Sequence, residues 1–271
     1  MRATRRRPVR RIGPGGTQTR TDVLAGEEPL EIRVQGEAYA VTMRTPGDDF
    51  DLVFGFLFSE QIIARAEDVA TLSYAGGVDP DGSRSYNVID ATLASGVSLP
   101  ARSRNVYTSS SCGVCGTASM EAIERSSAFD ITADEVRVST DVVLSLPDRL
   151  RAAQKLFGRT GGVHASGLFT PGGELVCVRE DVGRHNALDK VVGWALREGR
   201  LPLSGQLLQV SGRLSFELVQ KAHLAGVPVL TAVGAPSALA VELAQESGIT
   251  TCGFMRPDGC NVYSHPERLV G

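Results

Sequence analysis

The stretch LLQVSGRLSFELVQKAHLAGVPVLTA, residues 207–232, decides the fold class. Its two ends are short apolar runs typical of buried strands, and between them Phe216, Val219 and Ala222 recur at helical spacing. A further helix and the strand-like segment 249–254 follow. This alternation predicts a parallel or mixed sheet with helices on its faces, an α/β architecture. Ligands of such sheets bind beyond the carboxyl ends of the strands.

The rest of the chain predicts two β-hairpins, further strands and further helices. Apolar and polar residues alternate in the strand segments, and glycine or proline residues separate them. We expect strand pairs over 29–35 with 38–43 and 162–169 with 174–179, strands over 87–93 and 104–107, and helices after Asp48, from Pro147 to Phe157 and around Leu188. No long linker interrupts this order, so residues 23–271 are treated as one domain.

The charge of the chain is unevenly distributed. The 271 residues carry a net charge of −3, but the first 20 contain seven arginines and no acidic residue. The rest of the chain, with 21 basic and 31 acidic residues, carries −10. Residues 1–22 are also rich in proline and glycine, and we expect a disordered Arg-rich tail. A basic tail on an acidic body does not favour nucleic acid as a partner.

Composition also bears on the cellular compartment. No apolar stretch follows the N-terminal arginines, as a secretory signal would require. The longest apolar run, residues 52–58, is far shorter than the ~20 residues of a membrane span. Five cysteines, an odd number, argue against a disulfide framework. We therefore expect a cytoplasmic protein that makes no membrane contact.

Two cysteines separated by two residues are the strongest chemical signal of the chain. They lie in SSSCGVCG, residues 109–116, which precedes a predicted helix. Free amide N–H groups and the dipole at a helix N-terminus favour negative charge, which shifts Cys112 or Cys115 toward the thiolate form. Neighbouring glycines leave the sulfur atoms open to the approach of another molecule. We therefore predict that Cys112 and Cys115 are the reactive groups.

The spacing of this pair leaves three kinds of chemistry open. A structural zinc ion needs four ligands, and Cys252, Cys260 and His265 supply more of them only if the fold gathers them. A thioredoxin-like redox centre fits the spacing and the following helix. A sulfur carrier fits equally, with one cysteine holding a persulfide and the other protecting or releasing it by exchange. Spacing alone does not separate the last two.

Two loops that join a predicted strand to a helix carry residues suited to binding an anion. Backbone N–H groups at a helix entry attract phosphate, and a nearby arginine adds positive charge. A histidine at such an entry adds a base. The residues that we assign to an anion site on these grounds are Ser211, Gly212, Arg213, Arg184 and His185. His164, in a glycine-rich strand, is a core histidine or a residue of the same cleft.

Five motifs of the chain together resemble those of the FdhD family, sulfur carrier proteins required for formate dehydrogenase activity. In family order, they are SSSCGVCG (109–116), GVHASG (162–167), EDVGRHNALDK (180–190), SGRLSFE (211–217) and NVYSHP (261–266). The resemblance implies a three-layer mixed-sheet fold like that of cytidine deaminases, with added β-hairpins. Deaminase activity is not implied, because zinc deaminases need His-x-Glu before Pro-Cys-x-x-Cys. Here Ser111 precedes Cys112, and the His-x-Glu at His265 lies downstream.

The resemblance also implies a chemistry and a set of partners. A cysteine desulfurase would load a persulfide onto Cys112, and the carrier would pass the sulfur to the molybdenum of a bis-molybdopterin guanine dinucleotide cofactor. Formate dehydrogenase would be the client, the carrier would be a homodimer, and no permanent metal would be bound. The family's cofactor-binding residues map onto Phe254, Met255, Arg256, Pro257, Asp258 and Gly259. The alternatives are a zinc-stabilised nucleotide-binding module without turnover and a dithiol oxidoreductase.

Overall fold

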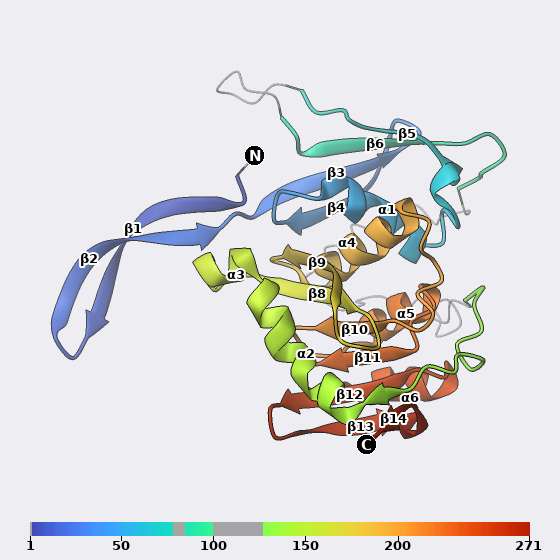
Figure 1. Ribbon diagram of the computed structural model, residues 1–271. Coiled ribbons are helices and arrows are strands. Elements are labelled where there is room, and N and C mark those ends of the chain that lie inside the picture. Colours follow the sequence, from blue (N-terminus) through green and yellow to red (C-terminus); the bar gives the residue numbers. More distant parts are fainter. Residues whose placement is uncertain (1, 78–84, 100–126) are drawn as a thin grey trace.

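The centre of the molecule is a six-stranded mixed sheet (Figure 1). The computed structural model describes residues 2–77, 85–99 and 127–271. The strands of this sheet are β8 (His164–Phe169), β9 (Leu175–Asp181), β10 (Leu207–Val210), β11 (Val229–Ala232), β12 (Thr250–Arg256) and β13 (Gly259–Ser264). They lie in the order β13-β12-β11-β10-β8-β9, in which β10, β11 and β12 are parallel and the outer pairings are antiparallel. The mixed α/β architecture predicted from residues 207–232 is confirmed.

Helices cover both faces of this sheet. Successive side chains of a strand point to opposite sides, so its apolar strands present apolar side chains on both faces. The covering helices are α2 (Thr140–Ala153), α4 (Arg184–Arg197), α5 (Phe216–Leu224) and α6 (Ala238–Glu246). Leu207 and Val229 pack with Leu150 of α2 in one apolar cluster. Their neighbours Leu208 and Leu230 pack with α4, α5 and α6 in the other cluster. The sheet is therefore the middle layer of three.

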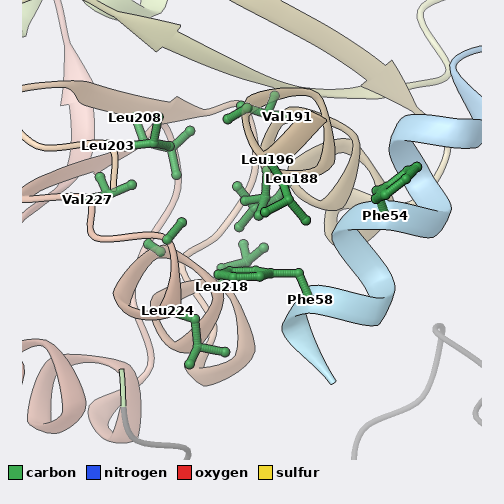
Figure 2. Close-up of a cluster of buried hydrophobic side chains, with 14 of the residues drawn as sticks. Phe54, Phe58, Leu188, Val191, Leu196, Leu203, Leu208, Leu218, Leu224 and Val227 are labelled. Carbon is green, nitrogen blue, oxygen red and sulfur yellow. The ribbon is translucent and has the colours of Figure 1, made fainter. Parts of the chain in front are cut away.

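A second, four-stranded sheet packs onto the α4 side. Its strands, in the order β4-β3-β6-β5, are β3 (Glu28–Val34), β4 (Glu37–Arg44), β5 (Val69–Tyr74) and β6 (Val88–Leu93). Helix α1 (Asp49–Ser59) joins the same core, and Figure 2 shows Phe58 of α1 extending toward Leu218 of α5 and Leu188 of α4. The hairpin over 29–43 and the helix after Asp48 are confirmed.

The helix expected to begin at Pro147 begins seven residues earlier, so this prediction was wrong. The structure has α2 over Thr140–Ala153, with Pro147 inside it, followed by α3 (Lys155–Thr160). The Ser139 side chain caps α2 by accepting a hydrogen bond from the backbone N–H of Asp141. Proline inside a helix removes one backbone hydrogen bond and crowds the preceding turn, and packing of Val143 and Leu146 holds that turn in place.

The first 25 residues differ from the expected disordered tail. Strands β1 (Thr4–Gly13) and β2 (Gly16–Ala25) pair as a long antiparallel arm that projects from the body (Figure 1). A two-residue loop, Pro14 and Gly15, sets the register, and β-branched residues recur along both strands. Composition does not predict this pairing. A high content of arginine and glycine indicates exposure to solvent, but it does not show which residues pair across two strands.

The remaining short elements complete the edges of the molecule. They are η1 (Ala66–Asp68), β7 (Val138–Ser139), η3 (Pro266–Arg268) and β14 (Leu269–Val270), and β14 pairs with β7. Among the helices of the described ranges, none combines the length and apolar character needed to cross a membrane.

Candidate functional site

A pocket opens at the carboxyl edge of the parallel strands, where α/β sheets bind ligands. Ser211 follows β10, Val233 follows β11, and Met255 and Arg256 end β12, and all four line the pocket. His164, at the start of the antiparallel β8, reaches the same edge. The cavity measures about 530 Å³. Its opposite wall is formed by α2 and the segment that follows, with Leu144, Pro147, Leu150, Arg151, Gln154 and Phe157.

His164, Ser211 and Gly212 form the tightly packed end of this pocket. The Ser211 hydroxyl accepts a hydrogen bond from the backbone N–H of Ala165 and lies 3.4 Å from Nδ1 of His164. A Cβ atom at Gly212 would lie 3.3 Å from the same nitrogen, a tight contact that would require the imidazole to shift slightly. Burial, and then the charge of Arg184, lowers the pKa of His164, so its imidazole is neutral at pH 7.

The two helix entries predicted to bind an anion converge beside the pocket. Nε2 of His185, in the first turn of α4, lies 3.2 Å from Oγ of Ser215 and 3.1 Å from a carboxylate oxygen of Glu217 in α5. The hydrogen bond from His185 lowers the pKa of Glu217 to about 2. Nε of Arg184 is buried and has no hydrogen-bond partner among the described residues. Arg213 packs closely on Gly234.

Much of the 180–190 motif holds the fold together. Asp181 and Lys190 form a fully buried ion pair of 2.7 Å. Lys190 also donates to the carbonyl of Thr45, whose own N–H donates to Asp181. Asn186 donates to Asp181 and to the carbonyl of Met43. These bonds attach the β9–α4 loop to the turn after β4, and they position Arg184 and His185.

The predicted cofactor segment 254–259 forms the tip of the β12–β13 hairpin. Met255, Arg256 and Pro257 line the pocket, and Nη1 of Arg256 donates to the carbonyls of Val233 and Met255. Phe254 has a positive φ of 51° and is 45% exposed. The lining does not include Phe254, Asp258 or Gly259, nor does it include Gly212, Arg213, Arg184 or His185.

Sequence reasoning missed the wall contributed by α2 and α3. Arg151 lies with its guanidinium carbon 4.0 Å from the ring centre of Phe157, and both line the pocket. Glu180 accepts hydrogen bonds from the backbone N–H groups of Leu156 and Phe157, each 2.8 Å, and so caps the start of α3. No local motif marks these residues, because their arrangement depends on how α2 crosses the sheet.

The predicted reactive cysteine pair is not part of this geometry. Cys112, Cys115 and the strand expected over 104–107 lie outside the described residues. Within the described ranges, no three His, Cys, Asp or Glu side chains gather as metal ligands would. His265 instead contacts Glu267 and the carbonyl of Gln245, so it does not join Cys252 and Cys260 in a zinc site.

Comparison with known proteins identifies the family. The model of the FdhD/NarQ family matches residues 25–270. The sulfur carrier protein FdhD of Streptomyces avermitilis is 55% identical over 99% of this chain and 96% of its own length, and that of Mycobacterium tuberculosis is 52% identical over 99% of both. A crystal structure from Desulfotalea psychrophila, of a protein named for a formate dehydrogenase accessory role, superposes with a TM-score of 0.73. The two sequences are 26% identical, and the match covers 99% of this chain and 100% of the other chain. The chain therefore belongs to the FdhD/NarQ family.

Proposed function

We propose that the protein is a sulfurtransferase that takes persulfide sulfur from a cysteine desulfurase and delivers it to a molybdenum cofactor. The cofactor is bis-molybdopterin guanine dinucleotide, bound as substrate, and the client is formate dehydrogenase. The observation that carries the proposal is the pocket at the carboxyl edge of the sheet, which brings Ser211 and His164 together with Met255, Arg256 and Pro257. The names of its relatives support the same role.

The pocket suits one nucleotide of this substrate. A volume of about 530 Å³ lies in the range of small-molecule sites, and it is too small for the whole dinucleotide cofactor. Apolar residues of α2 offer a surface for a base, while the positive charge of Arg256 suits phosphate. The pterin and metal end of the substrate would then project from the pocket.

The chemistry needs both cysteines of the motif. The Cys112 thiolate attacks the outer sulfur of the desulfurase persulfide, whose S–S bond breaks and releases the desulfurase thiolate. Cys115 then attacks the inner sulfur of the Cys112 persulfide. A Cys112–Cys115 disulfide forms, and sulfide leaves with the electron pair to become a ligand of the molybdenum. A small-molecule thiol reduces the disulfide before the next cycle.

The decisive experiment replaces the cysteines one at a time. Incubation with desulfurase and cysteine should make the wild-type protein one sulfur atom heavier, and Cys112→Ala should abolish this gain. Cys115→Ala should still load sulfur but fail to activate formate dehydrogenase in cells that lack this protein. Cys177→Ala, a buried cysteine in β9, is the matched control and should retain both properties. Stoichiometric zinc that is lost on Cys112→Ala would instead support a zinc-stabilised module.

The nucleotide part of the proposal has its own test. Calorimetry with guanosine diphosphate should show binding that Arg256→Ala weakens about tenfold, because a charge-assisted hydrogen bond is lost. Arg200→Ala, which removes an arginine stacked on Trp194, should leave the affinity unchanged. Equal affinities in the two variants would remove the pocket from the proposal.

We further propose a cytoplasmic homodimer, for which light scattering on the purified chain should give twice the monomer mass.

A further inference from the structure

The β12–β13 hairpin carries two cysteines that the proposed sulfur transfer does not use. Cys252 lies in β12 and Cys260 lies in β13. The segment between them contains residues 254–259, the tip that borders the pocket. A covalent change at the two cysteines would therefore act on both ends of this tip.

The strand pairing places both thiols on one face of the sheet. Cys252 pairs with Val262, and Cys260 is two residues from Val262, so side-chain alternation points both cysteines the same way. On that face Cys252 is fully buried, and Cys260 packs against the same apolar cluster while remaining partly exposed. Phe254 and Met255 together oppose Cys260, which is a β-bulge. The interrupted ladder leaves the strand around Cys260 room to shift.

Contact between the two thiols makes them chemically unequal. The hydrogen bond from Cys252 lowers the pKa of Cys260 to about 7, so a large share of Cys260 is thiolate at neutral pH. The same contact and burial raise the pKa of Cys252. Burial is the main cause that raises the pKa of Cys177 to about 11. Cys260 is thus the nucleophile, Cys252 the adjacent second thiol, and Cys177 an inert reference.

We propose that Cys260 and Cys252 form a thiol modification site that reacts with hydrogen peroxide. The Cys260 thiolate attacks one peroxide oxygen, the O–O bond breaks, hydroxide leaves, and Cys260 becomes a sulfenic acid. Cys252 then attacks this sulfur, the S–O bond breaks, and water leaves as the S–S bond forms. One peroxide is reduced to two waters, and two thiols are oxidised to one disulfide.

The consequence for the pocket rests on the proposed function. A disulfide between Cys252 and Cys260 would tie β13 covalently to β12 beside the bulge. That bulge presents Met255 and Arg256 to the pocket. Oxidation should therefore disturb the tip and weaken the binding of a guanine nucleotide.

The first test follows the disulfide directly in the full chain. Trypsin does not cleave the Arg256–Pro257 bond, so both cysteines remain on the peptide 222–268, which contains no other cysteine. After peroxide treatment at pH 7, the unreduced peptide should be lighter by two hydrogen atoms, while Cys177 stays a free thiol. Alkylation should label Cys260 at least about 100-fold faster than Cys177, as their thiolate fractions require.

Variants of each cysteine test the two chemical steps separately. In Cys252→Ser, Cys260 should oxidise to sulfinic acid without a cross-link, and in Cys260→Ser the Cys252 thiol should resist peroxide. A wild-type peptide that keeps both thiols while the peptide of Cys112 oxidises would overturn the proposal. Persistent sulfenic acid at Cys260 without a cross-link would overturn it as well.

A second test separates this site from the sulfur carrier. In the Cys112→Ala/Cys115→Ala variant, oxidation should weaken guanosine diphosphate binding at least about tenfold, and a reducing agent should restore it. The Cys260→Ser change in the same background should make the affinity insensitive to peroxide. If the reduced protein binds no nucleotide, the proposed function fails while the disulfide stands. If the disulfide forms and the affinity is unchanged, the effect on the pocket is refuted.

Discussion

At the scale of single residues, the 180–190 motif contains a buried charge pair whose role is to hold a loop. Asp181 is completely buried and accepts hydrogen bonds from the backbone N–H groups of Thr45 and Gly183. It also forms an ion pair with Lys190. A buried ion pair adds little net stability, but removing one partner leaves an uncompensated charge. Asp181 and Lys190 therefore have a structural role in the fold.

This gives a first prediction for Lys190. Lys190→Met should lower the free energy of unfolding by about 3–5 kcal/mol in urea denaturation, because the Asp181 carboxylate stays buried without its cation. Lys155→Met, at an exposed position of α3, should change it by less than about 0.5 kcal/mol. A loss below about 1 kcal/mol for Lys190→Met would mean that water or the neighbouring amides already compensate the carboxylate.

A second residue-scale prediction concerns pH and Glu217. The pKa of Glu217 is lowered from 4.5 to about 2 in the folded protein, chiefly by the hydrogen bond from His185. A carboxyl group with a depressed pKa adds stability above its unfolded pKa and loses it as the pH falls toward the folded pKa. The advantage of wild type over Glu217→Gln should therefore be full above pH 4.5 and vanish near pH 2.

The size of this effect is limited by solvent. The Glu217 side chain is 38% exposed, so we expect about 1 kcal/mol at pH 6. Thermal unfolding measured from pH 2 to pH 7 tests it, with Glu246→Gln in α6 as an exposed control that should follow wild type throughout. A wild-type advantage that grows as the pH falls would contradict the sign of the shift.

At the scale of elements, the crossing of α1 and α4 sets the distance between the two halves of the core. A Cβ atom at Gly55 would overlap the carbonyl of Asp189, and one at Gly193 would overlap the carbonyl of Asp51. The two glycines thus let each helix backbone lie directly against the other. Phe54 and Phe58, on α1, depend on this approach to reach the α4–α5 core (Figure 2).

Alanine at either glycine should therefore be destabilising. Gly55→Ala or Gly193→Ala should force the helices apart and cost about 3 kcal/mol in chemical denaturation. Gly158→Ala, in α3, is the matched control, because a Cβ atom at this helical glycine would have no neighbouring atom within 4 Å. Alanine there should stabilise the protein by up to about 1 kcal/mol. Equal effects at the three sites would show that helix propensity, and not contact, governs them.

At the scale of the whole molecule, the β1–β2 arm stands apart from the two packed sheets. Its attachment consists of a backbone hydrogen bond from Gly26 to Ala3, an ion pair between Arg5 and Glu28, and contact with α3. Most of its residues are exposed along both strands. A two-stranded ribbon with so little cover is only marginally stable by itself.

Limited proteolysis should therefore separate the arm from the body. Among the described residues, trypsin should cut first at the arginines of the arm, such as Arg10, Arg11 and Arg20, because local opening there is easy. The remaining body should keep the melting temperature of the full chain within about 2 °C. Earlier cleavage in α4 or the central sheet, or a large fall in melting temperature, would show that the arm supports the body.

The sequence by itself determined the local features of this protein. Periodicity identified the strands around Leu207 and Val229 and the helices between them, because burial on a sheet face imposes a residue pattern that can be read without neighbours. Five short motifs indicated the family, and the position of Ser211 after a strand indicated the edge of the sheet at which a pocket lies.

Only the tertiary structure decided which side chains meet. Arg151 and Phe157 of the pocket wall, and the partnership of Asp181 with Lys190, depend on how elements far apart in the chain cross one another. Pro147 misled the sequence-based boundary, since packing of α2 on the sheet overrides a local preference. The arm was likewise missed, because pairing between β1 and β2 is set by the register of two strands and composition carries no register.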